Sequence, residues 1–501
     1  MIVAGPGTGK TRTLTHRIAA AVAGRGTPPE SWLAITFTRR AAQEMRERLA
    51  RLLPGQARGV TVSTFHGLGL AILRECHQQA GLTAGFQVAG EQLVAAVAAE
   101  AAGSQRAAAQ LLAAEDPAGR ARLAQALATR DLVSFDGLLE EPVRLLGADP
   151  ALAERLRVRW PFVCVDEYQD IDARQYELLR LLAGDGRGLT VIGDPDQAIY
   201  GFRGADVAFF QRFRDDFPGA SIVELTRGYR CAPVILAGAL QAVAPATLVP
   251  GRTLRPAGPS RAGLEASRIW FHEAADEHAE AAWIARAVDR LLGGASFHSL
   301  DTGRADGHAA TALGLADIAV LYRTDAQAAA LGQGLTRAGL PWQKRSHDLL
   351  ARRPATAEIA GELRRAGPAG RPVTGRLQAA VGTLSQQAPL RGLTTVDIQA
   401  AGEVLAPLAR RCGDDLERFL TEITVGAEAD SLDPRADAVT LLTLHAAKGL
   451  EFEVVFLAGC ERGLLPLWLP GGPPGRQRPG RRKAAAVRRH DPCPQPAVPD
   501  V

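Results

Sequence analysis

Ile2-Val3-Ala4-Gly5-Pro6-Gly7-Thr8-Gly9-Lys10-Thr11 is the run that decides the fold of the first part of this 501-residue chain. Three apolar residues typical of a strand lead into a loop that fits GxxxxGK[ST], and a helical pattern continues to about Ala23. Glycines let successive backbone N–H groups face phosphate oxygens, and the helix N-terminus adds partial positive charge. We therefore expect this loop to bind nucleotide phosphates, with the Lys10 amine on the β- and γ-phosphates and the Thr11 hydroxyl on Mg²⁺.

An acidic pair at the end of a hydrophobic strand is expected to complete such a site. Residues 162–165 are typical of a buried strand, and Asp166 and Glu167 follow it directly. Asp166 would hold the magnesium ion, directly or through water, and Glu167 would orient and deprotonate the attacking water. The alternative is an ordinary solvated loop that carries two acids. The upstream glycine loop favours the catalytic interpretation.

Short apolar runs alternate with helical patterns along most of the chain, which predicts an α/β fold with parallel sheets. The segments 75–155 and 346–436 are rich in Ala, Leu and Arg and are mainly helical in pattern, the first with few strand signals. We therefore expect two α/β cores, each interrupted by a helical insertion. The expected strands are 2–4, 33–37, 60–63, 162–165, 189–192, 222–225, 318–322, 439–442 and 454–457.

Composition narrows the class of protein. Hydrophobic residues make up 47% of the chain, enough for several cores, and no apolar run approaches the ~18 residues of a membrane span. The six cysteines include no CxxC pair, so neither a zinc cluster nor a disulfide framework is indicated, and a reducing cytoplasm is expected. The net charge of +4 invites a nucleic-acid interpretation, but residues 470–501 alone carry +5, which leaves −1 for residues 1–469.

Asp166-Glu167-Tyr168-Gln169-Asp170 resembles the corresponding motif of the UvrD/Rep/PcrA family of superfamily 1 DNA helicases. Further resemblances follow in the order that the family has. They reach from residue 1 to about residue 466, and so many ordered matches are not a chance result. They are motif Ia at 35–42, motif Ib at 63–66, motif III at 193–205, motif IV at 225–230 and motif V at 443–452.

The resemblance implies roles for the matching residues. Gln197 would sense the γ-phosphate and relay its presence to the DNA groove, and Arg230 would contact that phosphate as an arginine finger. Tyr229 would stack on adenine, and Glu451 would touch the ribose. The implied nucleotide-binding set is Gly5, Pro6, Gly7, Thr8, Gly9, Lys10, Thr11, Arg12, Tyr229 and Glu451. The implied DNA-binding set is Phe37, Thr38, Thr64, His66, Tyr200, Phe202, Arg203, His445 and Lys448.

Several of these residues also have an ordinary structural interpretation. Phe37 could pack in the core instead of stacking on bases, and His66 could be a capping or core histidine. Tyr200 and Phe202 flank a glycine in a loop after a strand, so we expect them to be exposed and to contact DNA. Gly228 stands where the family usually has Asn, which is expected to loosen the motif IV turn.

The resemblance also implies the domain plan and the partners. It predicts two RecA-like cores, residues 1–74 with 156–218 and residues 219–345 with 437–469, and helical insertions at 75–155 and, shortened, at 346–436. The implied activity is ATP- and Mg²⁺-dependent 3′-to-5′ movement on single-stranded DNA, with unwinding of duplex in repair or replication. We expect a cytoplasmic monomer that binds single strands and single-strand/duplex junctions, works with repair or replication proteins and has no membrane partner.

The sequence departs from the family at both ends. The upstream Gln-containing segment is missing before Gly5, and residues 470–501 form a Pro/Arg-rich segment that we expect to be irregular. Read one nucleotide later, codons for residues 482–494 can spell Glu-Arg-Arg-Arg-Leu-Phe-Val-Gly-Met-Thr-Arg-Ala-Arg, which contains the family's arginine motif. We therefore hypothesise a frameshift upstream of about Arg482. The alternative function is a non-catalytic ATP- and DNA-binding remnant that lacks this motif.

Overall fold

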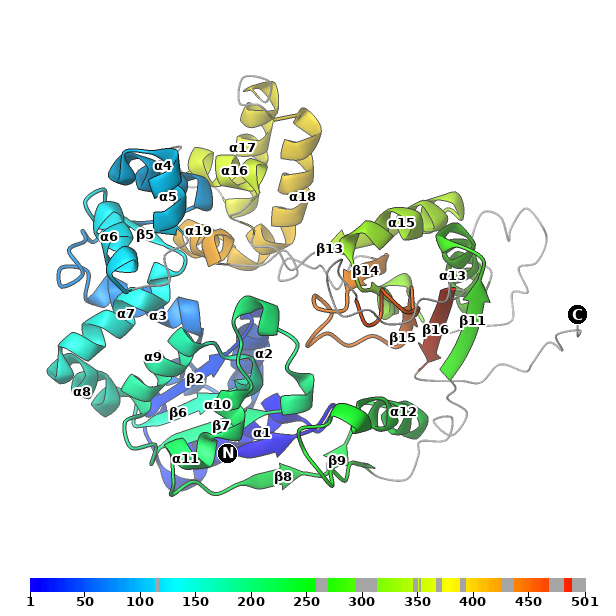
Figure 1. Ribbon diagram of the computed structural model, residues 1–501, viewed down its shortest axis with the longest axis horizontal. Coiled ribbons are helices and arrows are strands. Elements are labelled where there is room, and N and C mark those ends of the chain that lie inside the picture. The colour runs from blue at the N-terminus through cyan, green and yellow to red at the C-terminus, as the bar shows by residue number, and fades with distance from the viewer. Residues whose placement is uncertain are drawn as a thin grey trace, which may run out of the picture. The chain divides into compact units, whose positions relative to one another are not determined.

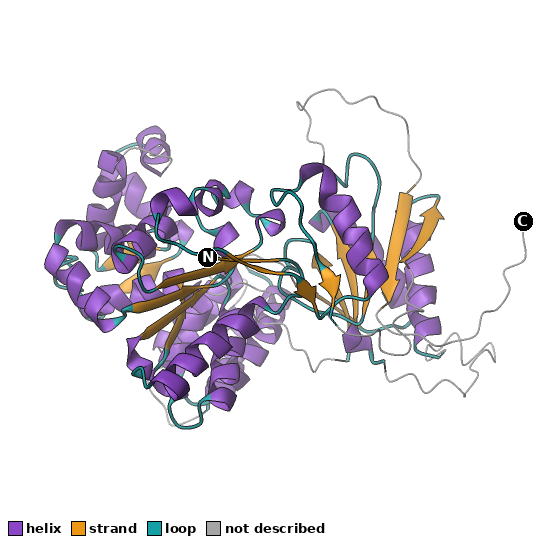
Figure 2. Ribbon diagram, turned by 90° about the horizontal axis from the view of Figure 1, so that it is seen from below, coloured by secondary structure: helices purple, strands orange, loops and turns teal. Residues whose placement is uncertain are grey.

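The computed structural model describes residues 1–112, 117–257, 269–293, 313–345, 350, 353–365, 372–387, 393–425, 437–467 and 482–488. Its contacts divide the chain into two compact units. The first contains Met1–Gly5, Gly9–Leu225 and Asp348–Ser431, and the second contains Pro6–Thr8, Thr226–His347 and Leu432–Val501. Each unit is built around one six-stranded sheet with helices against it (Figures 1 and 2). This arrangement confirms the predicted α/β class with parallel strands.

All the strands of the first sheet are parallel, in the order β3-β2-β6-β7-β1-β8. Side chains of successive strand residues point to opposite faces, so each strand contributes to two cores. Helices α1 and α2 cover one face, where Ala34 and Cys164 are fully buried, whereas Leu33 and Val163 face a larger core with α3, α7 (Gly137–Ala148) and α9. The strands are β1 (Ile2–Ala4), β2 (Trp32–Thr36), β3 (Thr61–Thr64), β6 (Phe162–Val165), β7 (Leu189–Gly193) and β8 (Val223–Leu225), and the helices are α1 (Lys10–Arg25), α2 (Arg39–Leu52), α3 (Phe65–Glu75), α9 (Ala173–Ala183), α10 (Ala208–Gln211) and α11 (Phe213–Asp216).

Two mainly helical insertions belong to the first unit. The first insertion is not purely helical, because β4 and β5 pair in parallel inside it. The second insertion has an apolar core of its own. The elements of the first are β4 (Gln87–Ala89), α4 (Glu91–Ala102), α5 (Gln105–Leu112), α6 (Pro117–Ala128), β5 (Leu132–Ser134), α7 (Gly137–Ala148) and α8 (Pro150–Arg159); those of the second are α16 (Pro354–Arg365), α17 (Val373–Gln387), α18 (Thr395–Cys412) and α19 (Leu416–Val425).

The second unit has a mixed sheet in the order β11-β16-β15-β12-β14-β13. Strand β16 runs antiparallel to β11 and β15, whereas β12, β13, β14 and β15 pair with one another in parallel. A short parallel pair, β9 with β10, precedes the sheet. The elements are β9 (Arg227–Gly228), α12 (Pro233–Val243), β10 (Arg255–Pro256), β11 (Ile269–Ala274), α13 (Glu277–Leu291), β12 (Ile318–Tyr322), α15 (Ala328–Arg337), β13 (Trp342–Arg345), β14 (Val439–Thr443), β15 (Val454–Leu457) and β16 (Arg482–Arg488).

The structure changes the predicted domain plan in three places. β8 was expected in the second core, but it pairs with β1 through Ile2 and Val223 and so closes the first sheet. The second insertion groups with the first core, where Arg39 at the start of α2 forms an ion pair with Glu422 of α19 at 2.6 Å. Within the segment predicted to be irregular, 482–488 form β16. Local patterns could not reveal the first two differences, because both depend on contacts that are distant in sequence.

In the part of the chain that the structure describes, no helix combines the length and the apolar character needed to cross a bilayer.

Gly69 sits where α3 crosses α7 closely. A Cβ built on Gly69 would lie 1.8 Å from the Leu138 carbonyl oxygen, which is backbone and cannot rotate away. We predict that Gly69→Ala forces the two helices apart and lowers the free energy of unfolding by roughly 1–3 kcal/mol. Gly24→Ala is the matched control, because this helical glycine of α1 has open space around it and should gain about 0.5–1 kcal/mol. Equal stability of the two variants in urea denaturation would contradict the described helix crossing.

Candidate active site

The loop after β1 adopts the backbone that its glycines permit. Gly7 and Gly9 have φ angles of +70° and +83°, in the left-handed region that favours glycine. Gly9 is the N-cap of α1, so Lys10 and Thr11 begin the helix. Gly7 is also needed for space, because a Cβ there would lie 2.7 Å from the Arg230 Cβ. The loop therefore has the strand–loop–helix geometry expected of a phosphate-binding site.

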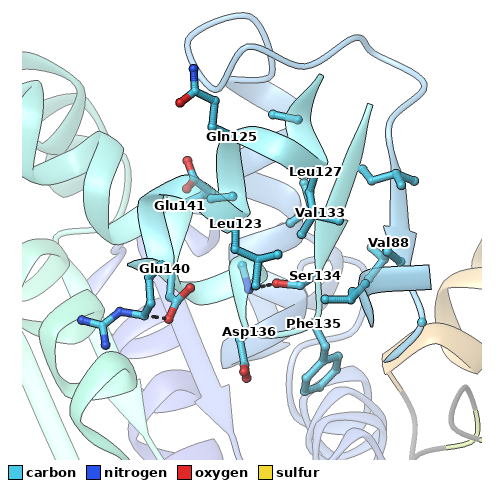
Figure 3. A pocket seen from close by; sticks show the side chains of 18 of the residues that line it. Val88, Leu123, Gln125, Leu127, Val133, Ser134, Phe135, Asp136, Glu140 and Glu141 are labelled. Atoms are coloured by element: carbon cyan, nitrogen blue, oxygen red, sulfur yellow. Dashed lines mark hydrogen bonds and ion pairs between the residues drawn. The ribbon is translucent and has the colours of Figure 1, made fainter. Parts of the chain in front are cut away.

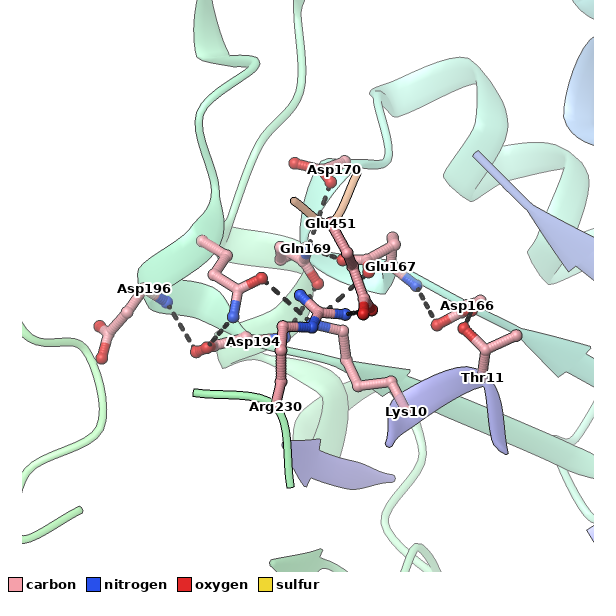
Figure 4. Close-up of polar contacts among 11 residues, drawn as sticks. Lys10, Thr11, Asp166, Glu167, Gln169, Asp170, Asp194, Asp196, Arg230 and Glu451 are labelled. Carbon is pink, nitrogen blue, oxygen red and sulfur yellow. Dashed lines mark hydrogen bonds and ion pairs between the residues drawn. The ribbon is translucent and has the colours of Figure 1, made fainter. Parts of the chain in front are cut away.

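The side chains of Lys10 and Thr11 meet residues from the ends of two neighbouring strands (Figure 4). The Lys10 Nζ donates to the Gln197 Oε1 at 3.1 Å and lies 3.5 Å from the Glu167 Oε1. The Thr11 hydroxyl donates to the Asp166 Oδ2 at 2.8 Å. Because the carboxyl ends of parallel strands share one edge of a sheet, residues far apart in sequence converge here.

Asp166 lies in an unusual electrostatic environment. It is 3% exposed, and burial raises the pKa of its carboxyl to about 6, with the adjacent Glu167 charge adding to the rise. The hydrogen bond from Thr11 acts in the opposite direction. A buried carboxylate beside a second acid is stabilised by a nearby cation, and a hydroxyl with a carboxylate is a hard-oxygen donor set that suits Mg²⁺. The residues present therefore fit a magnesium ion shared with nucleotide phosphates.

Two residues that sequence reasoning left without a role connect this cluster. The side-chain amide nitrogen of Gln169 donates to the Glu167 Oε2 at 2.5 Å, and its side-chain amide oxygen accepts the Asp194 backbone N–H at 2.9 Å. The Asp194 Oδ2 in turn accepts from the Gln197 Nε2 at 2.7 Å. Both Gln169 and Asp194 are fully buried. Their only sequence signal was their place inside the two motifs, because buried amide contacts leave no periodic pattern.

The predicted nucleotide residues of the second unit lie close to one another. The Tyr229 side chain is 63% exposed, and its backbone N–H donates to the Gly7 carbonyl at 2.8 Å. Arg230 forms an ion pair with Glu451, and both side chains are substantially exposed. Gly228 has ordinary room for a Cβ, 3.5 Å from Leu236, so the described backbone does not require glycine there. Of the remaining loop residues, Thr8 is buried and Arg12 is exposed.

The three predicted DNA-track aromatics differ in exposure: Tyr200 is buried, Phe37 is partly buried and Phe202 is exposed. Phe202 is 67% exposed, as expected. The expectation of exposure was wrong for Tyr200, which is 2% exposed because its ring stacks on Phe37, with centroids 5.0 Å apart. This stack gives Phe37 a packing role of the kind that the alternative interpretation allowed. The Arg203 side chain lies outside the described part of the chain.

The predicted polar DNA residues occupy helix starts and turns. Thr38 and Thr64 are the N-caps of α2 and α3, and each accepts a backbone N–H three residues on at 3.1 Å. His445 and Lys448 lie in the turn after β14. This turn ends at Gly449, which has a φ of +83°. The caps hold the threonine hydroxyls at the carboxyl edge of the first sheet.

A separate cavity of about 960 Å³ lies in the first unit, among α4 to α7, and α16 contributes to its wall (Figure 3). Its lining includes none of the predicted catalytic, nucleotide-binding or DNA-binding residues. An ion pair between Arg174 and Glu140 at 2.8 Å forms part of its polar wall, and burial raises the pKa of Glu140. This cavity is therefore distinct from the phosphate-binding loop.

A phosphate loop, an acidic strand end and a glutamine-bearing strand end on one parallel sheet define a P-loop nucleoside triphosphatase core of the RecA-like kind. Comparisons with known proteins give the family. The model of the UvrD/REP helicase N-terminal domain matches residues 1–118 and 118–218, and that of the UvrD-like helicase C-terminal domain matches residues 399–476.

Individual relatives agree with the family models. The ATP-dependent DNA helicase UvrD2 of Mycobacterium tuberculosis is 33% identical to this chain in an alignment that covers 93% of this chain and 71% of the relative. The ATP-dependent DNA helicase PcrA is 27% identical in Bacillus subtilis and 25% identical in Staphylococcus aureus, covering 93% of this chain and 76% of each relative. The chain belongs to the UvrD/Rep family of DNA helicases, as its motifs indicated.

His66 supplies a pH-dependent contribution to stability. Its ring stacks on Phe135 at 4.1 Å, and burial lowers its pKa to about 4. Between pH 6.5 and 4 the unfolded chain binds the proton and the folded chain does not, so stability is lost as the pH falls through this range. We predict that His66→Phe, which keeps a ring on Phe135, reduces the stability lost between pH 7 and pH 5 by about 1–2 kcal/mol.

Urea denaturation at the two pH values measures this difference. His16→Asn is the matched control, because it removes a histidine from the exposed surface of α1 and leaves the stacked His66–Phe135 pair in place. The same loss of stability in His66→Phe and in the unaltered chain would show that His66 does not titrate in this way.

Proposed function

We propose that this chain is an ATP-dependent translocase that moves 3′-to-5′ on single-stranded DNA and unwinds duplex DNA in repair or replication. The observation that carries the proposal is the meeting of Lys10 and Thr11 with Gln197 and Asp166 at the carboxyl edge of the first sheet. This group of side chains has the charges that a triphosphate and its metal require. Membership of the UvrD/Rep family and the names of the relatives support ATP and DNA as the ligands.

Each residue of the cluster has a distinct task in this proposal. The loop N–H groups and the Lys10 amine bind the β- and γ-phosphates, and Thr11 and Asp166 would hold Mg²⁺. Mg²⁺, when bound, neutralises phosphate charge. Glu167 orients and deprotonates the attacking water, and Gln197 contacts the γ-phosphate. Lys10 also balances the charge of Glu167, 3.5 Å away, when no nucleotide is bound.

The remaining predicted residues bind the base, the ribose and DNA. Tyr229 stacks on adenine, Glu451 contacts the ribose and Arg230 stabilises charge on the γ-phosphate. For Tyr229 this is supported by its exposed ring. Phe202, with its exposed ring, stacks on DNA bases, and the polar DNA-track residues, with His445 and Lys448, contact the backbone. We further propose a cytoplasmic monomer that acts at single-strand/duplex junctions.

A second candidate function is a non-catalytic ATP- and DNA-binding remnant. The observation that favours it is that residues 470–501, in the printed reading frame, do not contain the family's arginine motif. An arginine that faces the γ-phosphate contributes about 10³–10⁵ in rate to comparable enzymes. The chain as printed would then bind ATP without efficient turnover, and restoring the shifted frame would recover it.

ATP hydrolysis with and without single-stranded DNA separates the two candidates. We predict near-background turnover for the chain as printed and strong DNA stimulation for the version with the restored frame. In that version, Lys10→Ala should reduce turnover by about 100-fold or more, because it removes the phosphate-binding amine. Lys344→Ala is the matched control: Lys344 pairs with Asp325 on the surface of the second unit, and its loss should leave turnover unchanged.

Two outcomes would contradict these expectations. Robust DNA-stimulated turnover by the chain as printed would remove the case for the frameshift and for the remnant. A restored version that hydrolyses no ATP in the presence of DNA would overturn the translocase proposal.

The direction of movement is tested with tailed duplexes. The restored version should unwind a duplex that carries a 3′ single-stranded tail and leave a 5′-tailed duplex of the same sequence intact. Gel separation of the released strand measures this, and a blunt duplex serves as the control. Unwinding of the 5′-tailed substrate alone would reverse the assigned polarity and leave the ATPase assignment untouched.

A further inference from the structure

Gln169 occupies the centre of the polar cluster behind the phosphate loop. It lies directly after the acidic pair, on the short 3₁₀ turn Tyr168–Asp170, and is fully buried. Its amide nitrogen donates to the Glu167 Oε2 at 2.5 Å and to the Asp170 Oδ2 at 3.1 Å, and its amide oxygen accepts the Asp194 N–H at 2.9 Å (Figure 4). All three partners are thus strong hydrogen-bonding groups of the first unit.

These partners fix the orientation of the Gln169 amide. A backbone N–H can only donate, so the group that meets Asp194 must be the amide oxygen. An ionised carboxylate can accept a hydrogen bond but cannot donate one. The groups of Gln169 that meet Glu167 and Asp170 must therefore be the two N–H groups of its amide. Rotating the amide by 180° would place its oxygen against the two carboxylates and its NH₂ group against the Asp194 N–H, and all three hydrogen bonds would be lost. Gln169 therefore holds one orientation and presents an N–H to Glu167.

Glu167 needs such a partner because its own backbone is unusual. It has a φ of +52°, one of two positive values among non-glycine residues in the described chain. That conformation costs of order 1 kcal/mol or more and persists where surrounding contacts enforce it. The Glu167 side chain is held on one oxygen by Gln169 and faces Lys10 with the other. Gln169 therefore restricts the rotation of the carboxylate that the proposed function assigns to the attacking water.

The same amide joins the ends of two strands. Through Asp194 it connects to Gln197, whose side-chain oxygen accepts a hydrogen bond from Lys10. Lys10 also lies beside Glu167, which Gln169 contacts directly, so the contacts form a closed ring. Gly193, the last residue of β7, leaves the space for Gln169, because a Cβ there would lie 2.4 Å from its amide oxygen. The ring links the water-orienting residue to the residue proposed to contact the γ-phosphate.

We propose that Gln169 is a positioning residue for ATP hydrolysis, which holds Glu167 in its working orientation and couples it to Gln197. This inference rests on the proposed function. Gln169 does not touch the phosphates, and its effect passes through Glu167. Its loss should therefore slow the chemical step and leave ATP binding, which depends on Lys10 and Thr11, nearly unchanged.

Gln169→Met tests this in the full chain with the restored frame, because methionine fills the same volume and makes none of the three hydrogen bonds. We expect kcat for DNA-stimulated ATP hydrolysis to fall by roughly 10- to 100-fold, with KM for ATP changed by less than about threefold. Glu167→Gln alone should lower kcat further than Gln169→Met does. Adding Gln169→Met to Glu167→Gln should cause no additional loss, because the residue that Gln169 positions is already disabled.

Gly193→Ala provides a second route if Gln169→Met does not fold, since it displaces the amide without changing Gln169. The same pattern of lower kcat at constant KM is expected. Unchanged kcat in the folded variant, or a full additional loss on the Glu167→Gln background, overturns the positioning role. If Glu167→Gln itself keeps normal kcat, the proposed function fails instead, so the two failures are distinguishable.

Discussion

The hydrogen bond from the Thr11 hydroxyl to the Asp166 carboxylate joins the two parts of the nucleotide site. Thr11 is fixed by the start of α1, and Asp166 by the end of β6, which is two strands away from β1 in the sheet. In the observed parallel order β7 lies between β6 and β1, and the contact spans the carboxyl end of β7. The fold of the first unit thus places a hydroxyl, a carboxylate and an amine together at one edge.

Burial gives this arrangement its chemical consequence. Asp166 is nearly inaccessible, and its raised pKa shows that the protein holds its negative charge at a cost. Glu167 adds a second negative charge, and Lys10 offsets only part of the repulsion. In the proposed function a magnesium ion with a triphosphate would resolve this imbalance, because the acids would hold the cation and Lys10 would bind the phosphates. Gln169 holds the Glu167 side chain by a hydrogen bond, and Asp194 holds that of Gln197.

Much of the architecture was accessible from the sequence. The phosphate loop, the acidic strand end and nearly all the predicted strands of the first sheet occur where their local patterns indicated. Features set by distant contacts were not accessible. The pairing of β8 with β1, the Arg39–Glu422 ion pair and the stacking of Tyr200 on Phe37 each join residues more than a hundred positions apart. The hydrogen bonds of Gln169 to Glu167 and Asp170 are local, but they were not accessible either, because a buried amide has no periodic signature in the sequence.

Magnesium-dependent ATP binding to the purified chain tests the central claim most directly. Calorimetric titration should show ATP binding that is at least about tenfold tighter with Mg²⁺ than with EDTA, and Asp166→Asn should remove most of that difference. This result does not require turnover, so the printed reading frame suffices. Equal affinity with and without Mg²⁺, or an Asp166→Asn variant that keeps the full difference, would contradict the assignment of Thr11 and Asp166 as the metal-binding pair.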